Sequence, residues 1–100
     1  MGDRTKSGQR QHDQAVLNWV QQMKTAGFKV KADLPNIPKP VKIGGDIPDA
    51  VATKGKIIKV LEVETPDSMV SDKEQRAKFR NWASQSDLRT FFTKIVRKNK

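Results

Sequence analysis

Apolar residues near the N-terminus of the chain repeat with the period of an α-helix. A spacing of i, i+3, i+4 and i+7 places four of them on one helical face, which predicts a helix over residues 10–26. They are Val16, Trp19, Val20 and Met23. Gly27 follows directly, and glycine is a frequent residue at the C-terminal end of a helix. We therefore expect the first helix to end there.

Four further segments have the pattern of β-strands. Residues 28–32 alternate apolar and basic side chains, which predicts a first strand. Residues 47–53 and 56–65 predict an antiparallel hairpin, because a short glycine-containing turn at Lys54-Gly55 joins them. Residues 56–65 carry apolar side chains on both faces, which indicates a central strand that is covered on both sides. Residues 88–97 predict a last strand, although their paired apolar residues also suit a short helix.

The remaining segments connect these elements or form a second helix. Residues 33–45 are rich in proline and glycine and predict a loop or an irregular edge strand. Residues 65–70 predict a loop, and residues from 71 to about 84 predict the second helix. Ser71 and Glu74 have the spacing of a capping box, in which each side chain binds the backbone N–H of the other residue. The order is helix, three strands, helix, strand, an α/β fold with a mixed sheet flanked by two helices.

Composition narrows the class of protein. A chain of 100 residues forms one domain, which we place at residues 10–100 behind a flexible N-terminal tail of residues 1–9. The absence of cysteine excludes disulfides and thiolate metal sites. No apolar run is long enough to span a membrane, and the polar N-terminus lacks the apolar stretch of a signal peptide. We therefore expect a soluble protein in the cytoplasm.

The net charge of +9, from 20 Lys and Arg against 11 Asp and Glu, indicates a polyanionic partner. Nucleic acid fits best, because phosphate neutralisation by Lys and Arg supplies most non-specific affinity. A basic surface kept for solubility is the alternative, and a membrane surface fits less well because no basic amphipathic helix stands out. Near the predicted site, the residues expected to contact DNA phosphates are Lys54, Lys56, Arg76, Lys78 and Arg80.

Two carboxylates end the most apolar strand. Glu62 and Glu64 are two residues apart, so they point to the same face of the sheet. Burying two like charges is costly without a cation, either a Lys or Arg of the chain or a divalent metal. Asp49 lies on the neighbouring strand, roughly across from residues 59–61, and with twist or a bulge it can approach Glu62. Three such acids offer hard oxygen ligands for Mg²⁺ or Mn²⁺. The alternative is that both glutamates end the strand at the solvent rim and pair with surface lysines.

These residues resemble a known nuclease superfamily. Ile47-Pro48-Asp49, a hairpin turn, and then Val60-Leu61-Glu62-Val63-Glu64 resemble the PD-(D/E)-x-K superfamily, which includes restriction endonucleases, Holliday-junction resolvases and RecB-type nucleases. The predicted order of elements is also that of the family core, αβββαβ, over residues 10–97. Glu64 departs from the pattern, because the family usually has lysine there. That lysine helps to position or deprotonate the attacking water.

The resemblance implies a DNA nuclease that uses Mg²⁺ or Mn²⁺. Asp49, Glu62 and the backbone carbonyl of Val63 would bind the metal, and Glu64 would take the place of the lysine. Gln75, four residues before Phe79, resembles the Q-x-x-x-Y element of RecB-like nucleases, with Phe in place of Tyr. Asp13, in the first helix, is the candidate for the acid that supports the metal site in family members, although an acid in a first turn also suits the helix dipole.

Three functions remain open on the sequence alone. The first is a metal-dependent deoxyribonuclease, which we would expect to act as a symmetric homodimer if it cuts both strands. The second is a catalytically inactive DNA-binding module on the same fold. The third is a basic structural or regulatory protein that binds an acidic protein partner. A phage or prokaryotic source fits so small a nuclease.

Overall fold

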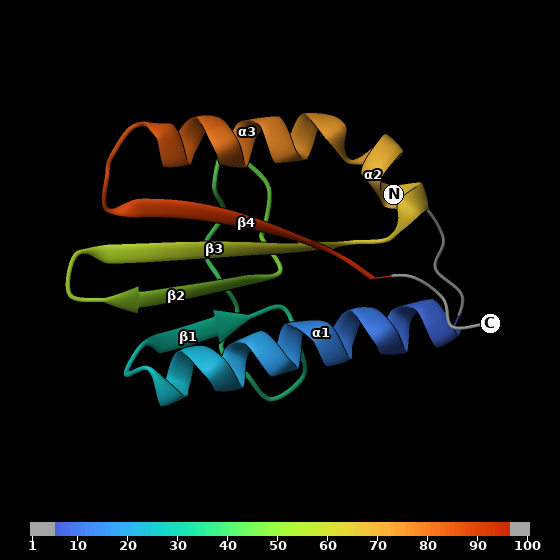
Figure 1. Cartoon of the computed structure of the whole chain (residues 1–100), viewed down its shortest axis with the longest axis horizontal. Helices are drawn as coiled ribbons and strands as arrows, with labels where there is room; N and C mark the ends of the chain where they lie inside the picture. The colour runs from blue at the N-terminus through green and yellow to red at the C-terminus, as the bar shows by residue number, and fades with distance from the viewer. Residues whose placement is uncertain (1–5, 97–100) are drawn as a thin grey trace.

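A four-stranded sheet between two helices forms the framework of the protein (Figure 1). The computed structural model describes residues 6–96. The elements are α1 (Lys6–Thr25), β1 (Lys29–Ala32), β2 (Ala50–Lys54), β3 (Ile57–Glu64), α2 (Pro66–Ser71), α3 (Lys73–Ser84) and β4 (Arg89–Ile95). The predicted helix, three strands, helix and strand are confirmed, with α2 as an additional short helix.

The strands lie in the order in which they occur in the chain, β1-β2-β3-β4. β1, β2 and β3 form an antiparallel meander, and β4 pairs with β3 in parallel. The sheet is therefore mixed, and β3 lies in its interior as its apolar pattern predicts. Within the predicted range 88–97, Arg89–Ile95 form a strand and not the alternative short helix, and Arg97 lies outside the described residues.

Two apolar cores lie on opposite faces of the sheet. α1 packs on one face, where Val16 and Val20 meet Leu61 and Val63 of β3. α3 packs on the other face, where Phe79 meets Val60. Val60 points to one face of the sheet, and Leu61 and Val63 point to the other. This explains why β3 has apolar residues at both odd and even positions. Glu62 and Glu64 share the face of Val60, so their carboxylates lie on the α3 side.

Turns set the bounds of the first helix and of the hairpin. α1 ends at Thr25, and Gly27 adopts a φ of +90°, a conformation that glycine adopts without strain. Phe28 N then donates to the carbonyl of Met23 at 2.9 Å, which closes the helix end. The β2–β3 turn consists of Gly55 and Lys56, one residue later than predicted, with Gly55 at a φ of +59°.

Three predicted boundaries are wrong. α1 begins at Lys6, so part of the predicted tail is helical, while residues 1–5 lie outside the described part. β2 begins at Ala50 and not at residue 47, because proline at position 48 has no N–H for the ladder. The predicted loop at residues 65–70 is largely α2, which begins at Pro66.

The capping box lies at α2 and not at α3. Thr65 caps the helix by accepting from the backbone N–H of Ser68, and the Ser68 hydroxyl accepts from the backbone N–H of Thr65. Ser71 instead lies within α2, and Asp72, the N-cap residue of α3, makes no side-chain capping bond. The predicted pairing of Ser71 with Glu74 is therefore wrong, because a helix already occupies residue 71.

Candidate active site

Asp49 and Glu62 meet where β2 begins and β3 nears its end. The hairpin register pairs Ala50 with Leu61, so the next residue along each strand brings these two acids opposite one another. The backbone N–H of Asp49 donates to Oε1 of Glu62 at 2.8 Å. In return, the backbone N–H of Val63 donates to Oδ2 of Asp49 at 2.7 Å. Asp49 therefore approaches Glu62 as predicted, through direct hydrogen bonds between the two strands. The predicted position across from residues 59–61 is wrong, because the turn lies one residue later and the register places Asp49 opposite Glu62.

Gln75 brings α3 to the same point. Its side-chain Nε2 donates to Oε2 of Glu62 at 3.2 Å. Gln75 lies one turn before Phe79, which is buried against Val60, so the packing of α3 on the sheet directs Gln75 toward the acids. Both carboxylate oxygens of Glu62 thus have a hydrogen-bond donor, one from Asp49 just before β2 and one from α3.

The electrostatics of this pair favour a proton or a cation. Burial of Glu62, which is 4% exposed, together with the nearby charge of Asp49, raises the pKa of Glu62 from 4.5 to about 9. The hydrogen bond from the Asp49 backbone opposes this rise. Near neutral pH, Glu62 therefore holds a proton unless a positive charge replaces it.

Glu64 lies on the same face but has different partners. Its side chain is fully buried, and Oε2 accepts a hydrogen bond from the hydroxyl of Ser68. Oε1 is buried and has no hydrogen-bond partner within the described part of the chain. Burial raises the pKa of Glu64, while the Ser68 bond and the nearby Arg76 charge oppose the rise. The solvent-rim alternative does not hold for either glutamate, because both are buried.

His12 connects α1 to the acid pair. Its Nε2 lies 3.1 Å from Oδ2 of Asp49, and its Nδ1 lies 3.1 Å from Oδ1 of Asp13. The ring is only 4% exposed and thus lies between two carboxylates. A protonated imidazole donates to both, whereas a neutral ring donates to one. Asp13, the acid predicted to support the site from the first helix, therefore reaches Asp49 through His12.

The side-chain ligands for a metal are few. Among the side chains that the structure describes, no group of three or more His, Asp or Glu is arranged to hold a metal ion. Asp49 and Glu62 are close enough to contribute together, and Val63, whose carbonyl is the third predicted ligand, lies next to Glu62 on β3. Glu64 is turned toward Ser68 instead. A cation here would have two side-chain ligands and would need backbone, water or substrate oxygens for the rest.

The residues predicted to contact DNA are dispersed, and one assignment is wrong. Arg76 is buried, and its guanidinium donates to the carbonyls of Ser68 at 3.4 Å and Met69 at 2.6 Å, so it joins α3 to α2 and is not available to phosphate. Lys54 and Lys56 lie at the hairpin turn, the end of β3 opposite the acids (Figure 1).

The other two basic residues lie on α3. Lys78 pairs with Asp46 at 3.2 Å, although half of its side chain stays exposed, and Arg80 is exposed to solvent. The exposed cations of the predicted set therefore occupy two regions, the hairpin turn and the outer surface of α3.

Two contacts of the site were not predicted, although the sequence spacing of each residue indicates its position. His12 lies four residues before Val16, so it extends the apolar face of the first helix by one turn toward the sheet. Ser68 lies three residues after Thr65, the spacing of a helix N-terminus. His12 lies within hydrogen-bond distance of Asp49, and Ser68 donates a hydrogen bond to Glu64.

The chain matches no model of a protein family, no curated protein and no solved structure.

Proposed function

We propose that the protein is a metal-dependent deoxyribonuclease of the PD-(D/E)-x-K type, with Asp49 and Glu62 as the metal-binding acids. The single observation that carries this proposal is the close pairing of Asp49 with the buried carboxylate of Glu62, where two neighbouring strands meet. Such a pair is unfavourable without a proton or a cation, as the pKa of about 9 at Glu62 reflects. A net charge of +9 supplies the attraction to a polyanionic substrate.

The donor set fits Mg²⁺ or Mn²⁺. Both ions prefer oxygen ligands, and Mg²⁺ commonly binds through one or two carboxylates, with waters and substrate phosphate completing its shell. Asp49 and Glu62 are two such carboxylates, and the carbonyl of Val63 is a third candidate oxygen. A site with two acidic side chains is thus consistent with the lack of a three-residue cluster in the described chain.

Neighbouring residues hold the two acids in place. His12 contacts Oδ2 of Asp49, and Gln75 donates to Oε2 of Glu62. These contacts fix the side chains of the two acids on the sheet, as outer partners of metal ligands commonly do. When bound, a divalent cation would polarise the phosphoryl group and lower the pKa of a bound water.

Glu64 has a separate role in this proposal. It occupies the position where the family has lysine, and its Oε1 is buried without a partner among the described residues. In its deprotonated form, that oxygen can accept a proton from a water that enters the site. Ser68, which donates to Oε2, holds the carboxylate in a fixed orientation for this transfer.

The decisive experiment is a cleavage assay with the full chain. Plasmid, linear and branched DNA are incubated with Mg²⁺, with Mn²⁺ or with EDTA, for the wild type and for Asp49→Asn and Glu62→Gln. We expect metal-dependent cleavage that both variants lose, while their affinity for DNA in EDTA stays within about threefold of wild type, because phosphate contacts supply that affinity. Glu74→Gln, an exposed acid on α3, is the control and should cleave as wild type does. Cleavage by the double variant at the wild-type rate would overturn the assignment.

A second candidate function is DNA binding without hydrolysis. The observation that favours it is Glu64, which accepts a hydrogen bond from Ser68 and stands where the family usually has lysine. In that case, DNA binding weakens steeply with salt, and neither metal produces cleavage of any of the three DNA forms. The same assay therefore separates the two functions.

A further inference from the structure

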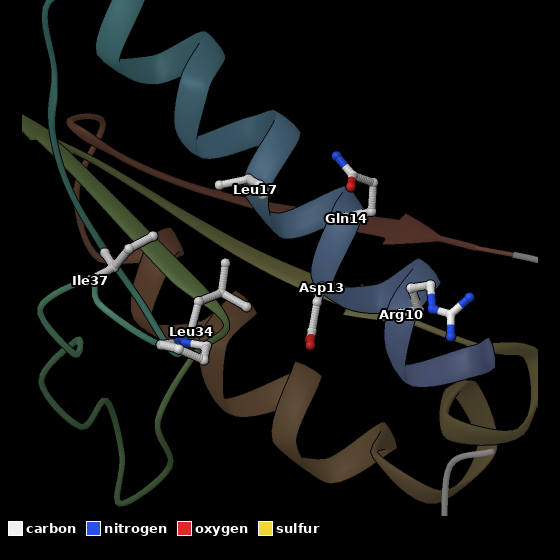
Figure 2. Close-up of a pocket in the computed structure, with 7 residues that line it drawn as sticks. Arg10, Asp13, Gln14, Leu17, Leu34 and Ile37 are labelled. Carbon is white, nitrogen blue, oxygen red and sulfur yellow. The ribbon is translucent and has the colours of Figure 1, made fainter. Parts of the chain in front are cut away.

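A pocket of about 290 Å³ lies between α1 and the segment that follows β1 (Figure 2). This volume is near the lower end for small-ligand sites, roughly 300–1,000 Å³. Polar and apolar side chains line it from two elements. α1 contributes Arg10, Asp13, Gln14 and Leu17, and the segment after β1 contributes Leu34, Pro35 and Ile37. Figure 2 shows the α1 side chains along one side, with Leu34 and Ile37 across from Leu17.

Two direct connections join this pocket to the acid pair. Asp13, in its wall, contacts His12, which contacts Asp49, so one imidazole ring separates the pocket from the site. The backbone N–H of Asp33, next to Leu34, donates to the carbonyl of Asp49 at 2.9 Å. A ligand in contact with Asp13 is therefore separated from Asp49 by the ring of His12.

The lining favours a ligand that is partly apolar and partly polar. Leu17, Leu34 and Ile37 offer apolar contact, whereas Asp13 offers only a hydrogen-bond acceptor when ionised. Both hydrogen bonds that the structure gives the Asp13 side chain use Oδ1, and 41% of the side chain is exposed. Enzymes that take a base out of the stack hold it in this way, between apolar side chains and with hydrogen bonds to its edge.

We propose that this pocket binds an unpaired nucleobase with an exocyclic amino group, on the DNA strand whose phosphate lies at Asp49 and Glu62. The proposal rests on the proposed function, which makes DNA the substrate. It adds that the substrate presents an unpaired base beside the cleaved phosphate, as single strands, frayed ends and junctions do. Arg10, exposed at the same wall, supplies a cation for the phosphate of the bound nucleotide.

The expected amino group on the base follows from Asp13, because its ionised carboxylate only accepts hydrogen bonds. Adenine, cytosine and guanine each carry an amino group that can donate a hydrogen bond to a carboxylate. Thymine has one ring N–H on its pairing edge, and the two carbonyl oxygens that flank it repel a carboxylate. A hydrogen bond to a charged group contributes enough to separate these ligands by about tenfold in affinity. We therefore expect dAMP, dCMP and dGMP to bind about tenfold more tightly than TMP.

The test is an NMR titration of the full chain in EDTA, which removes hydrolysis from the measurement. Each of the four deoxynucleoside monophosphates is added, and backbone amide shifts are followed. We expect saturable shifts at the amides of Gln14, Leu17 and Ile37, with TMP about tenfold weaker. Asp13→Asn, whose amide can donate as well as accept, should reduce the difference between TMP and the other three to about twofold or less. Short single-stranded oligomers, compared with duplexes of the same sequence, then show whether the base binds within a strand.

A blocking variant and a matched control complete the test. Gln14→Trp places a large side chain at the pocket and should abolish the shifts at Leu17 and Ile37. Gln21→Trp makes the same change seven residues later on the same face of α1, outside the pocket, and should leave them unchanged. Equal affinity for all four nucleotides, or shifts that persist in Gln14→Trp, would overturn the inference.

The outcome is distinguishable from failure of the proposed function. Metal-dependent cleavage by Gln14→Trp at the wild-type rate, without nucleotide shifts at the pocket in the wild type, rejects the pocket and leaves the nuclease. Selective nucleotide binding in a protein that cleaves no DNA supports the pocket and rejects the nuclease.

Discussion

Asp49 and Glu62 each hold the backbone of the other's strand. Glu62 accepts from the N–H of Asp49, and Asp49 accepts from the N–H of Val63, the residue after Glu62. Each acid thus satisfies a backbone donor that the β2–β3 ladder does not use. The hydrogen bonds that complete the hairpin therefore also hold the two carboxylates close to one another, where their charges repel.

The stability of the protein in EDTA should fall as pH rises. The pKa of Glu62 is about 9 in the folded protein and 4.5 in the unfolded chain. The folded state therefore retains a proton that the unfolded chain loses. The corresponding stability is fully present below pH 4.5 and is lost progressively up to about pH 9. Glu62→Gln cannot titrate, so its melting temperature should fall less over this range. Thermal melts from pH 5 to 9 measure the difference, and parallel curves would contradict the assignment.

Saturating Mg²⁺ should restore that loss in the wild type alone. A ligand that binds only the folded state stabilises it, and a cation replaces the proton on Glu62 at high pH. At pH 8 we expect the melting temperature of the wild type to rise with Mg²⁺ and that of Glu62→Gln to stay unchanged. Ca²⁺-free buffer with Na⁺ at matched ionic strength is the control for general screening.

Gln75 tests whether orientation of Glu62 matters for cleavage. Gln75→Ala removes the donor to Oε2 without changing charge, and loss of such an outer contact commonly reduces activity about 10- to 100-fold. Asn81→Ala, at an exposed position of the same helix, should retain wild-type activity. Metal-dependent cleavage rates under single-turnover conditions provide the measurement. An unchanged rate in Gln75→Ala would show that Glu62 is positioned without it.

Arg76 and Arg80 should differ in their effect on stability. Arg76→Ala removes donors to two carbonyls of α2 in a buried setting, which should cost about 2–4 kcal/mol. Arg80→Ala, at an exposed position, should stay within about 0.5 kcal/mol of wild type. Urea denaturation at equilibrium measures both. Similar values for the two variants would mean that Arg76 does not join the helices.

Phe79 and Phe92 should differ in their contribution to stability, because they differ in burial. Phe79 is fully buried and lies 5.7 Å from the ring of Phe91, whereas Phe92 on β4 is 39% exposed. Phe79→Ala should cost about 3–5 kcal/mol, and Phe92→Ala clearly less, because less apolar area leaves contact with the protein. If Phe79→Ala does not fold, Phe79→Leu tests the same packing with a smaller loss of volume.

The contribution of individual cations should appear in the salt dependence of DNA affinity. Lys54 and Lys56 lie at the hairpin turn and Arg80 lies on α3. Each that contacts a duplex phosphate should, when changed to alanine, reduce the slope of log K against log salt by about 0.9. Fluorescence anisotropy from 50 to 200 mM salt resolves such a change. An unchanged slope for all three places the DNA elsewhere.

Much of the fold could be predicted because the apolar pattern is local. The period of α1 and the two-sided apolar run of β3 specify elements whose side chains pack against the nearest layer. The hairpin turn at Gly55 then sets the register, and the register places Asp49 beside Glu62. This part of the site depends on contacts within one pair of strands, so the proximity of Asp49 to Glu62 could be predicted from the sequence.

The rest depends on how elements pack against one another. His12 reaches Asp49 only because α1 crosses the sheet at that position, and no periodicity specifies the crossing. α2 has six residues and too few apolar positions to show a period, so its capping by Thr65 was missed. The error at Arg76 follows from this, because its acceptors belong to the unpredicted helix.

The sequential order of β1, β2 and β3 also bears on how the chain folds. Asp49 and Glu62 are only 13 residues apart, whereas β4 reaches β3 after the whole of α2 and α3. Closing a short loop costs less conformational entropy than closing a long one, so the hairpin is the faster element to form. We therefore expect the two acids to come together before α3 brings Gln75 against them. In that interval, protons and ions from the solvent would be the counter-charges, so we expect the composition of the solvent to influence an early step of folding.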